Sequence, residues 1–419
     1  MTILLRQARI LSPGSPHHQL VRDILVEDGM IREIAENIEA PGARVIAHDH
    51  LHVSPGWMDL FAHFCDPGLE HKETLETGAA AAAAGGFTHV CVIPNTVPAI
   101  SQKAQVEYIY HRSASLTVQV MPLGSVSRNA EGKDLAEMYD MYDSGAVAFI
   151  GGTLPILSGA LMAKALQYVK KINKPIIQIP DERSLSAHGL MHEGIVSTRL
   201  GLPGKPAIAE EIMIARDIEL LRYTGSALHL TGISTRKGLQ LIRDAKSEGL
   251  NLTCSVTPYH LSFTDEDLTG YDTNLKVYPP LRSADDRAAL LEGLLDGTVD
   301  AIASHHMPQH SDDKVCEFEY AKHGMTTLES LFGVANRVVG NPGKLVELLA
   351  IASREILNLP VPVIREGEPA CLTLFDPREQ YTFTRDMIQS RSSNSPFIGQ
   401  QLTGKVLGII HEQKVHLHP

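Results

Sequence analysis

The chain has 419 residues, of which 43% are hydrophobic and 21% charged, and its formal net charge is −12 at pH 7. This is the composition of a soluble globular protein, and the negative charge argues against nucleic acid or an acidic membrane as the main partner, because phosphates would be repelled. The five cysteines are scattered without a Cys-x-x-Cys pair, and neither a signal-peptide core nor an apolar run of about 18 residues occurs, so we expect a cytoplasmic protein.

Both ends of the chain have the pattern of short strands. In RDILVEDGMIREI, two alternating apolar runs flank Glu27-Asp28-Gly29, which predicts a hairpin turn. The last 60 residues contain the strand-like runs ACLTLFDP, QYTFT and KVLGIIHEQKVHL, with glycine and proline between them. We therefore expect one small β domain assembled from both termini, residues 1–54 and 359–419.

The middle of the chain alternates strand-like and helical patterns, and several of the helical patterns end at glycine, as a left-handed cap prefers. Eight strands with helical crossovers predict an α/β protein with a (β/α)₈ barrel over residues 55–358, although the alternation also fits an open doubly wound sheet. Chemistry in such barrels lies at the carboxyl ends of the strands. The predicted strands are Trp57–His63, Thr88–Pro94, Leu116–Pro122, Ala146–Gly151, Pro175–Pro180, Ala227–Ile233, Leu250–Pro258 and Val299–His305.

Several segments between about Pro55 and Leu331 resemble, in order, dihydroorotase of the bacterial and multifunctional-complex kind. They include PGWMDLFAHFCDPG, AAAAAAGGFTHVCVIPNT, LMHEG, VTPYHL and YPPLRSADDRAALLEGLLDGTVDAIAS. The resemblance implies an amidohydrolase barrel with a β domain from both termini, and reversible ring opening of dihydroorotate to carbamoyl-aspartate in pyrimidine synthesis. It also implies one or two zinc ions that activate a water, and a carboxylate that moves its proton.

The metal-binding positions that this resemblance implies are largely substituted. The first strand of the family ends Asp-x-His-x-His, and this chain has Asp59, Phe61 and His63 there, so only the second histidine is retained. The catalytic aspartate after the eighth strand is replaced by His305. The other positions hold Ile150-Gly151-Gly152 after the fourth strand, Ile179 after the fifth and Gly232 after the sixth, while Cys65 and Tyr278 replace a substrate-binding arginine and asparagine.

Three groups of residues remain as candidates for a site. His63, His305 and His306, with Asp66 or Cys65, would form a replacement mononuclear metal site; the alternative is that they are ordinary rim and loop histidines. Asn95 in Pro94-Asn95-Thr96 would bind a substrate carboxylate or carbonyl, or would only turn the chain. No catalytic residue is assigned, and we expect no cofactor, with zinc only if the replacement site forms.

Three functions follow from these observations. The first is a catalytically silent dihydroorotase homologue that acts as a scaffold, and the resemblance supplies aspartate transcarbamoylase as its partner and a homodimer as its assembly. The second is a working dihydroorotase with a rearranged metal site. The third is a hydrolase of another cyclic amide.

Overall fold

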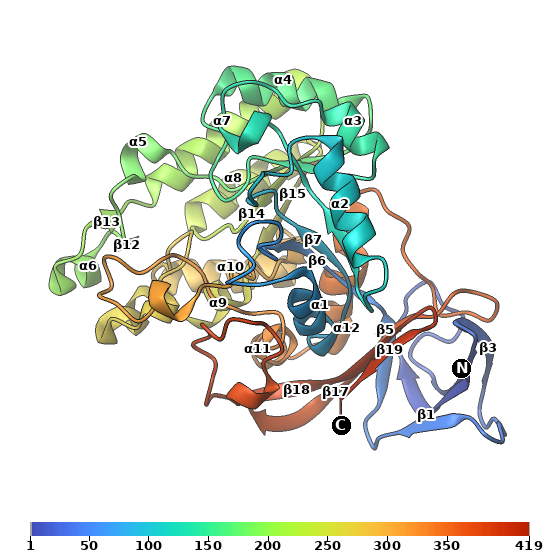
Figure 1. Cartoon of the computed structure of the whole chain (residues 1–419). Coiled ribbons are helices and arrows are strands. Elements are labelled where there is room, and N and C mark those ends of the chain that lie inside the picture. Colours follow the sequence, from blue (N-terminus) through green and yellow to red (C-terminus); the bar gives the residue numbers. More distant parts are fainter. Residues whose placement is uncertain (1, 419) are drawn as a thin grey trace.

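Eight parallel strands form a barrel in the computed structural model, which describes residues 2–418 (Figure 1). Each predicted strand is present, and the eight-stranded barrel prediction is confirmed. The strands are apolar and buried on both faces, as parallel strands covered by helices are. Their bounds are β6 (Trp57–Ala62), β7 (Phe87–Val92), β8 (Gln119–Pro122), β10 (Phe149–Ile150), β11 (Ile176–Gln178), β14 (Leu228–Thr231), β15 (Leu252–Val256) and β16 (Ala301–Ile302).

The barrel closes through backbone hydrogen bonds between its first and last strands. Ala62 forms a parallel bridge with His306, and the amide of His63 donates to the carbonyl of His306 at 2.9 Å. The third and fourth barrel strands are joined through the short β9 (Gly124–Ser125), which follows β8 in the chain and pairs with β10. Asp59 strengthens the closure, because its carboxylate accepts from the amide and the hydroxyl of Ser304 at 2.7 and 2.6 Å.

Helices cover the outside of the barrel. Between successive strands lie α1 (Leu75–Ala84), α2 (Lys103–Ser113), α3 (Met138–Asp143), α4 (Gly159–Lys170), α7 (Ile208–Thr224), α8 (Arg236–Ser247), α9 (Pro258–Ser262) and α10 (Ala284–Asp296). After β16 come α11 (Leu331–Val339), α12 (Pro342–Val346) and α13 (Ala352–Ile356). Within residues 2–418, no helix has the length and apolar character that crossing a bilayer requires.

Strands from both ends of the chain form one sheet with the order β19-β18-β17-β5-β1-β2-β3, and β4 pairs with β1. Figure 1 shows the red strands β17 and β19 of the C-terminal segment beside the blue β5 of the N-terminal segment. The hairpin prediction is confirmed, since Glu27 pairs with Met30 and both Asp28 and Gly29 have positive φ. The bounds are β1 (Thr2–Ile10), β2 (Val21–Glu27), β3 (Met30–Ala35), β4 (Arg44–Ala47), β5 (His52–Pro55), β17 (Cys371–Thr382), β18 (Gln401–His411) and β19 (Lys414–Leu417).

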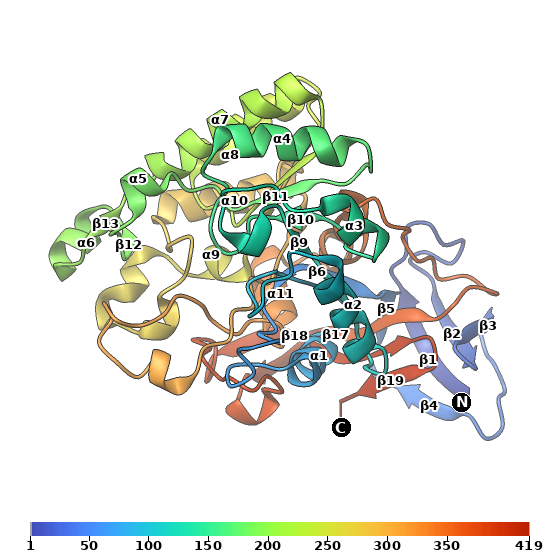
Figure 2. The same ribbon diagram turned by 45° about the horizontal axis from the view of Figure 1, so that its top comes forward.

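The structure differs from the sequence prediction in two places. The runs ACLTLFDP and QYTFT belong largely to one strand, β17, whose register shifts between Asp376 and Gln380. An excursion between β11 and α7, which the sequence did not predict, projects from the barrel in Figure 2. It consists of α5 (Arg183–Ser186), β12 (Met191–His192), α6 (Ile195–Leu200) and β13 (Gly204–Lys205).

Candidate functional site

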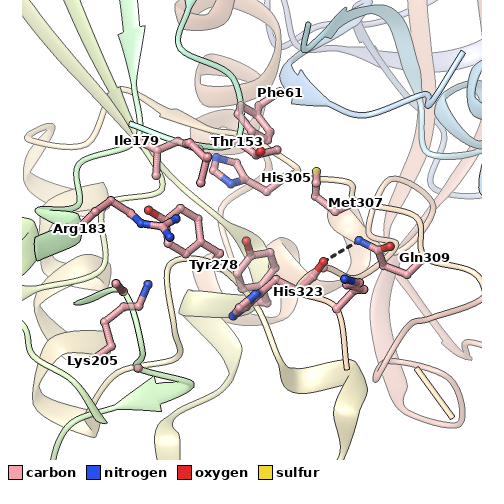
Figure 3. Close-up of a pocket in the computed structure, with 16 residues that line it drawn as sticks. Phe61, Thr153, Ile179, Arg183, Lys205, Tyr278, His305, Met307, Gln309 and His323 are labelled. Atoms are coloured by element: carbon pink, nitrogen blue, oxygen red, sulfur yellow. Dashed lines mark hydrogen bonds between the residues drawn. The ribbon is translucent and has the colours of Figure 1, made fainter. Parts of the chain in front are cut away.

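A cavity of about 280 Å³ lies at the carboxyl end of the barrel strands. Phe61 of β6 and residues that follow β10, β11 and β16 line it, together with residues of the excursion. Figure 3 shows Phe61, Ile179 and His305 on one side of the shared space, and Arg183 and Lys205 on the side that faces Tyr278. The polar members are Thr153, Arg183, Lys205, Tyr278, His305, Gln309, Lys322 and His323, and the larger apolar ones are Phe61, Leu154, Ile179, Tyr259 and Met307.

His305 packs as an aromatic ring. Its imidazole stacks on Phe61 with ring centroids 4.0 Å apart and planes 18° from parallel, and its Nε2 lies 2.8 Å from Oγ1 of Thr231. Burial lowers the pKa of His305 to about 3, with His260 and His229 adding to the effect. The side chain is therefore neutral near pH 7, with one nitrogen already in a hydrogen bond.

A chain of hydrogen bonds runs from His305 into the barrel. Thr231 Oγ1 lies 2.9 Å from Ser255 Oγ, which lies 3.0 Å from Nε2 of His229. Nδ1 of His229 lies 2.9 Å from Oγ1 of Thr253. Burial lowers the pKa of His229 to about 3, so this interior path is neutral and joins β14 to β15.

His63 uses both of its ring nitrogens within the protein. Nε2 donates to the backbone carbonyl of Asn95 at 3.1 Å, which leaves Nδ1 to accept from the thiol of Cys65 at 3.5 Å. Burial lowers the pKa of His63 to about 4 and raises the pKa of the Cys65 thiol. The Cys65 sulfur is therefore a protonated, buried hydrogen-bond donor, the opposite of an activated nucleophile.

The other predicted candidates also face protein partners. His306 accepts at Nδ1 from the amides of Thr327 and Leu328 at 3.1 and 3.3 Å, and its Nε2 lies 3.5 Å from a Glu73 carboxylate oxygen. The Asn95 side chain exchanges two hydrogen bonds with Thr153, at 2.8 and 3.1 Å. A third predicted residue, Asp66, accepts from the hydroxyl of Tyr108 at 2.7 Å.

The replacement metal site is not assembled in the structure. Among the residues described, two groups of three side chains have donor atoms within 4.8 Å of one another, and neither contains His63, His305, His306, Asp66 or Cys65. One group is His89, Cys371 and His411, where the guanidinium of Arg354 donates to His89 at 3.1 Å; the other is His48, Asp376 and Glu379.

The donor set at the barrel mouth does not fit a zinc ion. Phe61 and Ile179 have no lone pair, and Gly232 has no side chain, so three of the implied positions offer nothing to a metal. Gly232 has φ +72°, and a Cβ there would lie 2.9 Å from Cε1 of His305. The space that a ligand from this position would need is therefore filled by the His305 ring.

Sequence reasoning missed the charged wall of the cavity. Lys205 is buried and its Nζ lies 3.3 Å from Asp181, which also accepts from the hydroxyl of Tyr278 at 2.7 Å. Lys205 Nζ also sits 4.3 Å from the centroid of the Tyr278 ring. Arg183 and Lys205 stand at the two ends of the excursion. Their position after the fifth strand was the one sequence signal that could have indicated them.

The barrel and the sheet from both termini together define the amidohydrolase fold. L-Hydantoinase (dihydropyrimidinase) from Arthrobacter aurescens superposes with a TM-score of 0.87 at 22% identity, covering 100% of this chain and 97% of that one. A D-hydantoinase superposes with a TM-score of 0.84 at 18% identity, covering 100% and 95%. At these identities the likeness concerns the fold.

Sequence comparison identifies the family. The Dihydro-orotase-like family model matches residues 51–238. Proteins named dihydroorotase are 39% identical in Geotalea daltonii, over 99% of both chains, and 40% identical in Anaeromyxobacter dehalogenans, over 94% of both. The chain belongs to the dihydroorotase family.

Proposed function

We propose that this chain is a non-catalytic member of the dihydroorotase family that serves pyrimidine biosynthesis in the cytoplasm as a partner subunit. The observation that carries the proposal is the packing of the barrel mouth. Phe61 and His305 stack on each other where the family resemblance implies a metal ligand and the catalytic aspartate. Ile179 and Gly232 add no donor atom.

The lost groups are those on which the hydrolysis depends. A zinc ion takes the pKa of its bound water from 15.7 to about 7, and a general base contributes roughly 10²–10⁴-fold to the rate. A His305 ring with a pKa of about 3 is too weak a base to replace the aspartate near neutral pH. Loss of either contribution would bring ring opening close to its background rate.

The partner in this proposal is aspartate transcarbamoylase, and the chain itself is a homodimer. Both come from the family resemblance, in which some bacteria have inactive dihydroorotase-like chains in complex with that enzyme. The intact barrel supports such a role, because a scaffold needs the surface of the fold and not its reacting groups.

One purified sample tests the proposal in two assays. We expect less than one equivalent of zinc per chain after mild dialysis, and negligible cyclisation of carbamoyl-aspartate. The same sample, mixed with aspartate transcarbamoylase from the same cells, should elute as a complex in size-exclusion chromatography. A robust rate of cyclisation that a chelator abolishes would overturn the proposal.

A working dihydroorotase, or another cyclic amide hydrolase, with a rearranged metal site is the second candidate. It is favoured by the relatives named dihydroorotase, which are 37–40% identical over nearly the whole chain. It requires His63 and His305 or His306 to leave their present hydrogen bonds and turn toward one ion. Turnover of dihydroorotate compared with hydantoin rings would separate these two activities.

A further inference from the structure

The cavity at the barrel mouth has an unusual charge for this chain. Arg183, Lys205 and Lys322 line it, and no aspartate or glutamate stands among its described lining residues. The whole chain carries 49 acidic and 37 basic residues, so a cavity with three cations departs from the average surface. A concave site with one sign of charge concentrates ions of the opposite sign.

Two of these cations have no internal partner. Lys205 is compensated by Asp181, as described above. Within the described part of the chain, no residue accepts a hydrogen bond from the guanidinium of half-buried Arg183 or from the exposed ammonium of Lys322. Arginine forms paired hydrogen bonds with planar anionic groups, so Arg183 is ready to receive a carboxylate or a phosphate.

The cations also affect the pKa of a neighbouring lining residue, His323. The pKa of His323 is lowered to about 3, mainly by burial and in addition by the charges of Lys276, Lys205, Lys314 and Arg183. His323 is held in the wall by Gln309, whose amide donates to its backbone carbonyl at 2.7 Å (Figure 3). Two of the lining cations, Lys205 and Arg183, therefore act on the same lining side chain.

Most of the other lining side chains are planar rings or apolar groups. Five lining side chains are aromatic or imidazole rings, and Ile179 and Met307 add apolar surface between them. The volume of about 280 Å³ lies just below the usual range of ligand cavities, roughly 300–1,000 Å³. Ring surfaces of this kind favour a planar ligand, and the size favours a single ring. The five rings are those of Phe61, Tyr259, Tyr278, His305 and His323.

We propose that this cavity binds a small single-ring planar compound with one anionic substituent, and that Arg183 anchors the anionic group. The proposal goes beyond the proposed function and does not depend on it, because binding requires no turnover. The anchor also differs from the arginine that the family resemblance implies for a substrate carboxylate, since Cys65 stands at that position and hydrogen-bonds to His63. Carboxylate and phosphate share the chemistry that Arg183 recognises.

Calorimetric titration of the full-length chain at low salt tests the ligand class. The probes are benzoate and phenyl phosphate, with benzamide as a neutral ring, succinate as an anion without a ring, and dihydroorotate as a non-planar ring anion. We expect at least one planar ring anion to bind, about tenfold or more tightly than benzamide, succinate and dihydroorotate, and more weakly as salt is added. The benzoate and phenyl phosphate arms show which anionic group is preferred.

Two matched variants test the anchor. Arg183→Gln should weaken binding of the ring anion about tenfold or more, because it removes a charge-assisted hydrogen bond. Arg199→Gln, on α6 of the same excursion and facing Glu266 at 3.8 Å, should leave binding unchanged. Lys322→Gln, an exposed substitution, should weaken binding less and serves if Arg183→Gln fails to fold.

Several results would overturn the proposal. Binding of none of the probes would do so, as would equal binding of benzamide and benzoate, or tighter binding of dihydroorotate or succinate than of both planar anions. An equal loss in Arg199→Gln and Arg183→Gln would remove Arg183 as the anchor.

Discussion

The ring of His305 packs directly against Gly232, and Gly232→Ala, which adds one methyl group, tests this contact. A Cβ at residue 232 would lie 2.9 Å from Cε1 of His305 and 3.2 Å from Cδ of Pro279. The His305 ring has little room to retreat, because it stacks on Phe61 and hydrogen-bonds to Thr231. Gly232→Ala should therefore lower the free energy of unfolding by more than the backbone angle alone explains.

The expected magnitude has two parts. A non-glycine residue in the left-handed region costs about 1–2 kcal/mol, and forcing an extra carbon into a packed interior costs about 1–3 kcal/mol. We expect about 3 kcal/mol for Gly232→Ala. Gly297→Ala is the matched control, since Gly297 follows α10 with φ +83° and has no atom within 4 Å of an added Cβ. It should cost only the backbone part, about 1–2 kcal/mol.

Urea unfolding followed by the fluorescence of Trp57, the one tryptophan of the chain, measures both variants. In a His305→Ala background, the added cost of Gly232→Ala should fall toward that of Gly297→Ala, because the contact with the His305 ring is gone and only the contact with Pro279 at 3.2 Å remains. Equal costs for the two alanine variants in the unmodified chain would refute the reasoning. The confirmed result would mean that a histidine restored at residue 232 cannot be accommodated unless residue 305 changes with it.

Three further predictions concern the interior. His229 and His305 have pKa values near 3 when folded and about 6.5 when unfolded, so the unfolded chain binds more protons between these two values. The free energy of unfolding should therefore fall as the pH drops below about 6.5. His229→Gln should flatten this pH dependence in urea titrations, and an unchanged slope would contradict the prediction. Iodoacetamide should label Cys316 first in the native chain, because the other four thiols are buried, and mass spectrometry showing earlier labelling elsewhere would be inconsistent with this packing. Asp59→Ala leaves the amide and hydroxyl of Ser304 without their carboxylate partner and should lower the free energy of unfolding by about 3 kcal/mol, whereas Ser304→Ala should cost less.

The architecture was largely predictable because it follows from local patterns. Apolar runs of strand length, separated by helices of which several end at glycine, give the eight barrel strands in their correct order. The Asp28-Gly29 turn was predictable because its two positive φ angles suit these residue types. The excursion was not, because β12 and β13 have only two residues each and leave no periodicity to detect. The domain boundaries at residues 54 and 359 stay a prediction.

The site was less predictable than the fold, because alternation gives the face of a side chain but not its partner. His63 was predicted as the last residue of the first strand and lies directly after it, yet its two nitrogens are taken by Asn95 and Cys65, which no spacing rule reveals. His305 has φ +45°, so the alternation of side chains along the strand has already ended there and cannot give its orientation. Arg183 and Lys205 reach the cavity only through the path of the excursion.

The pairing of β5 with β17 has a consequence for how the chain is made. Pro55 pairs with Leu372, 317 residues later, and synthesis of that length takes roughly 15–65 s at about 5–20 residues per second. During that time the backbone groups along one edge of β5 have no strand to pair with. Unpaired strand edges can form hydrogen bonds with neighbouring nascent chains. Because β5 has only four residues, it offers few backbone groups to such a neighbour, and its brevity protects the growing chain until its own β17 emerges.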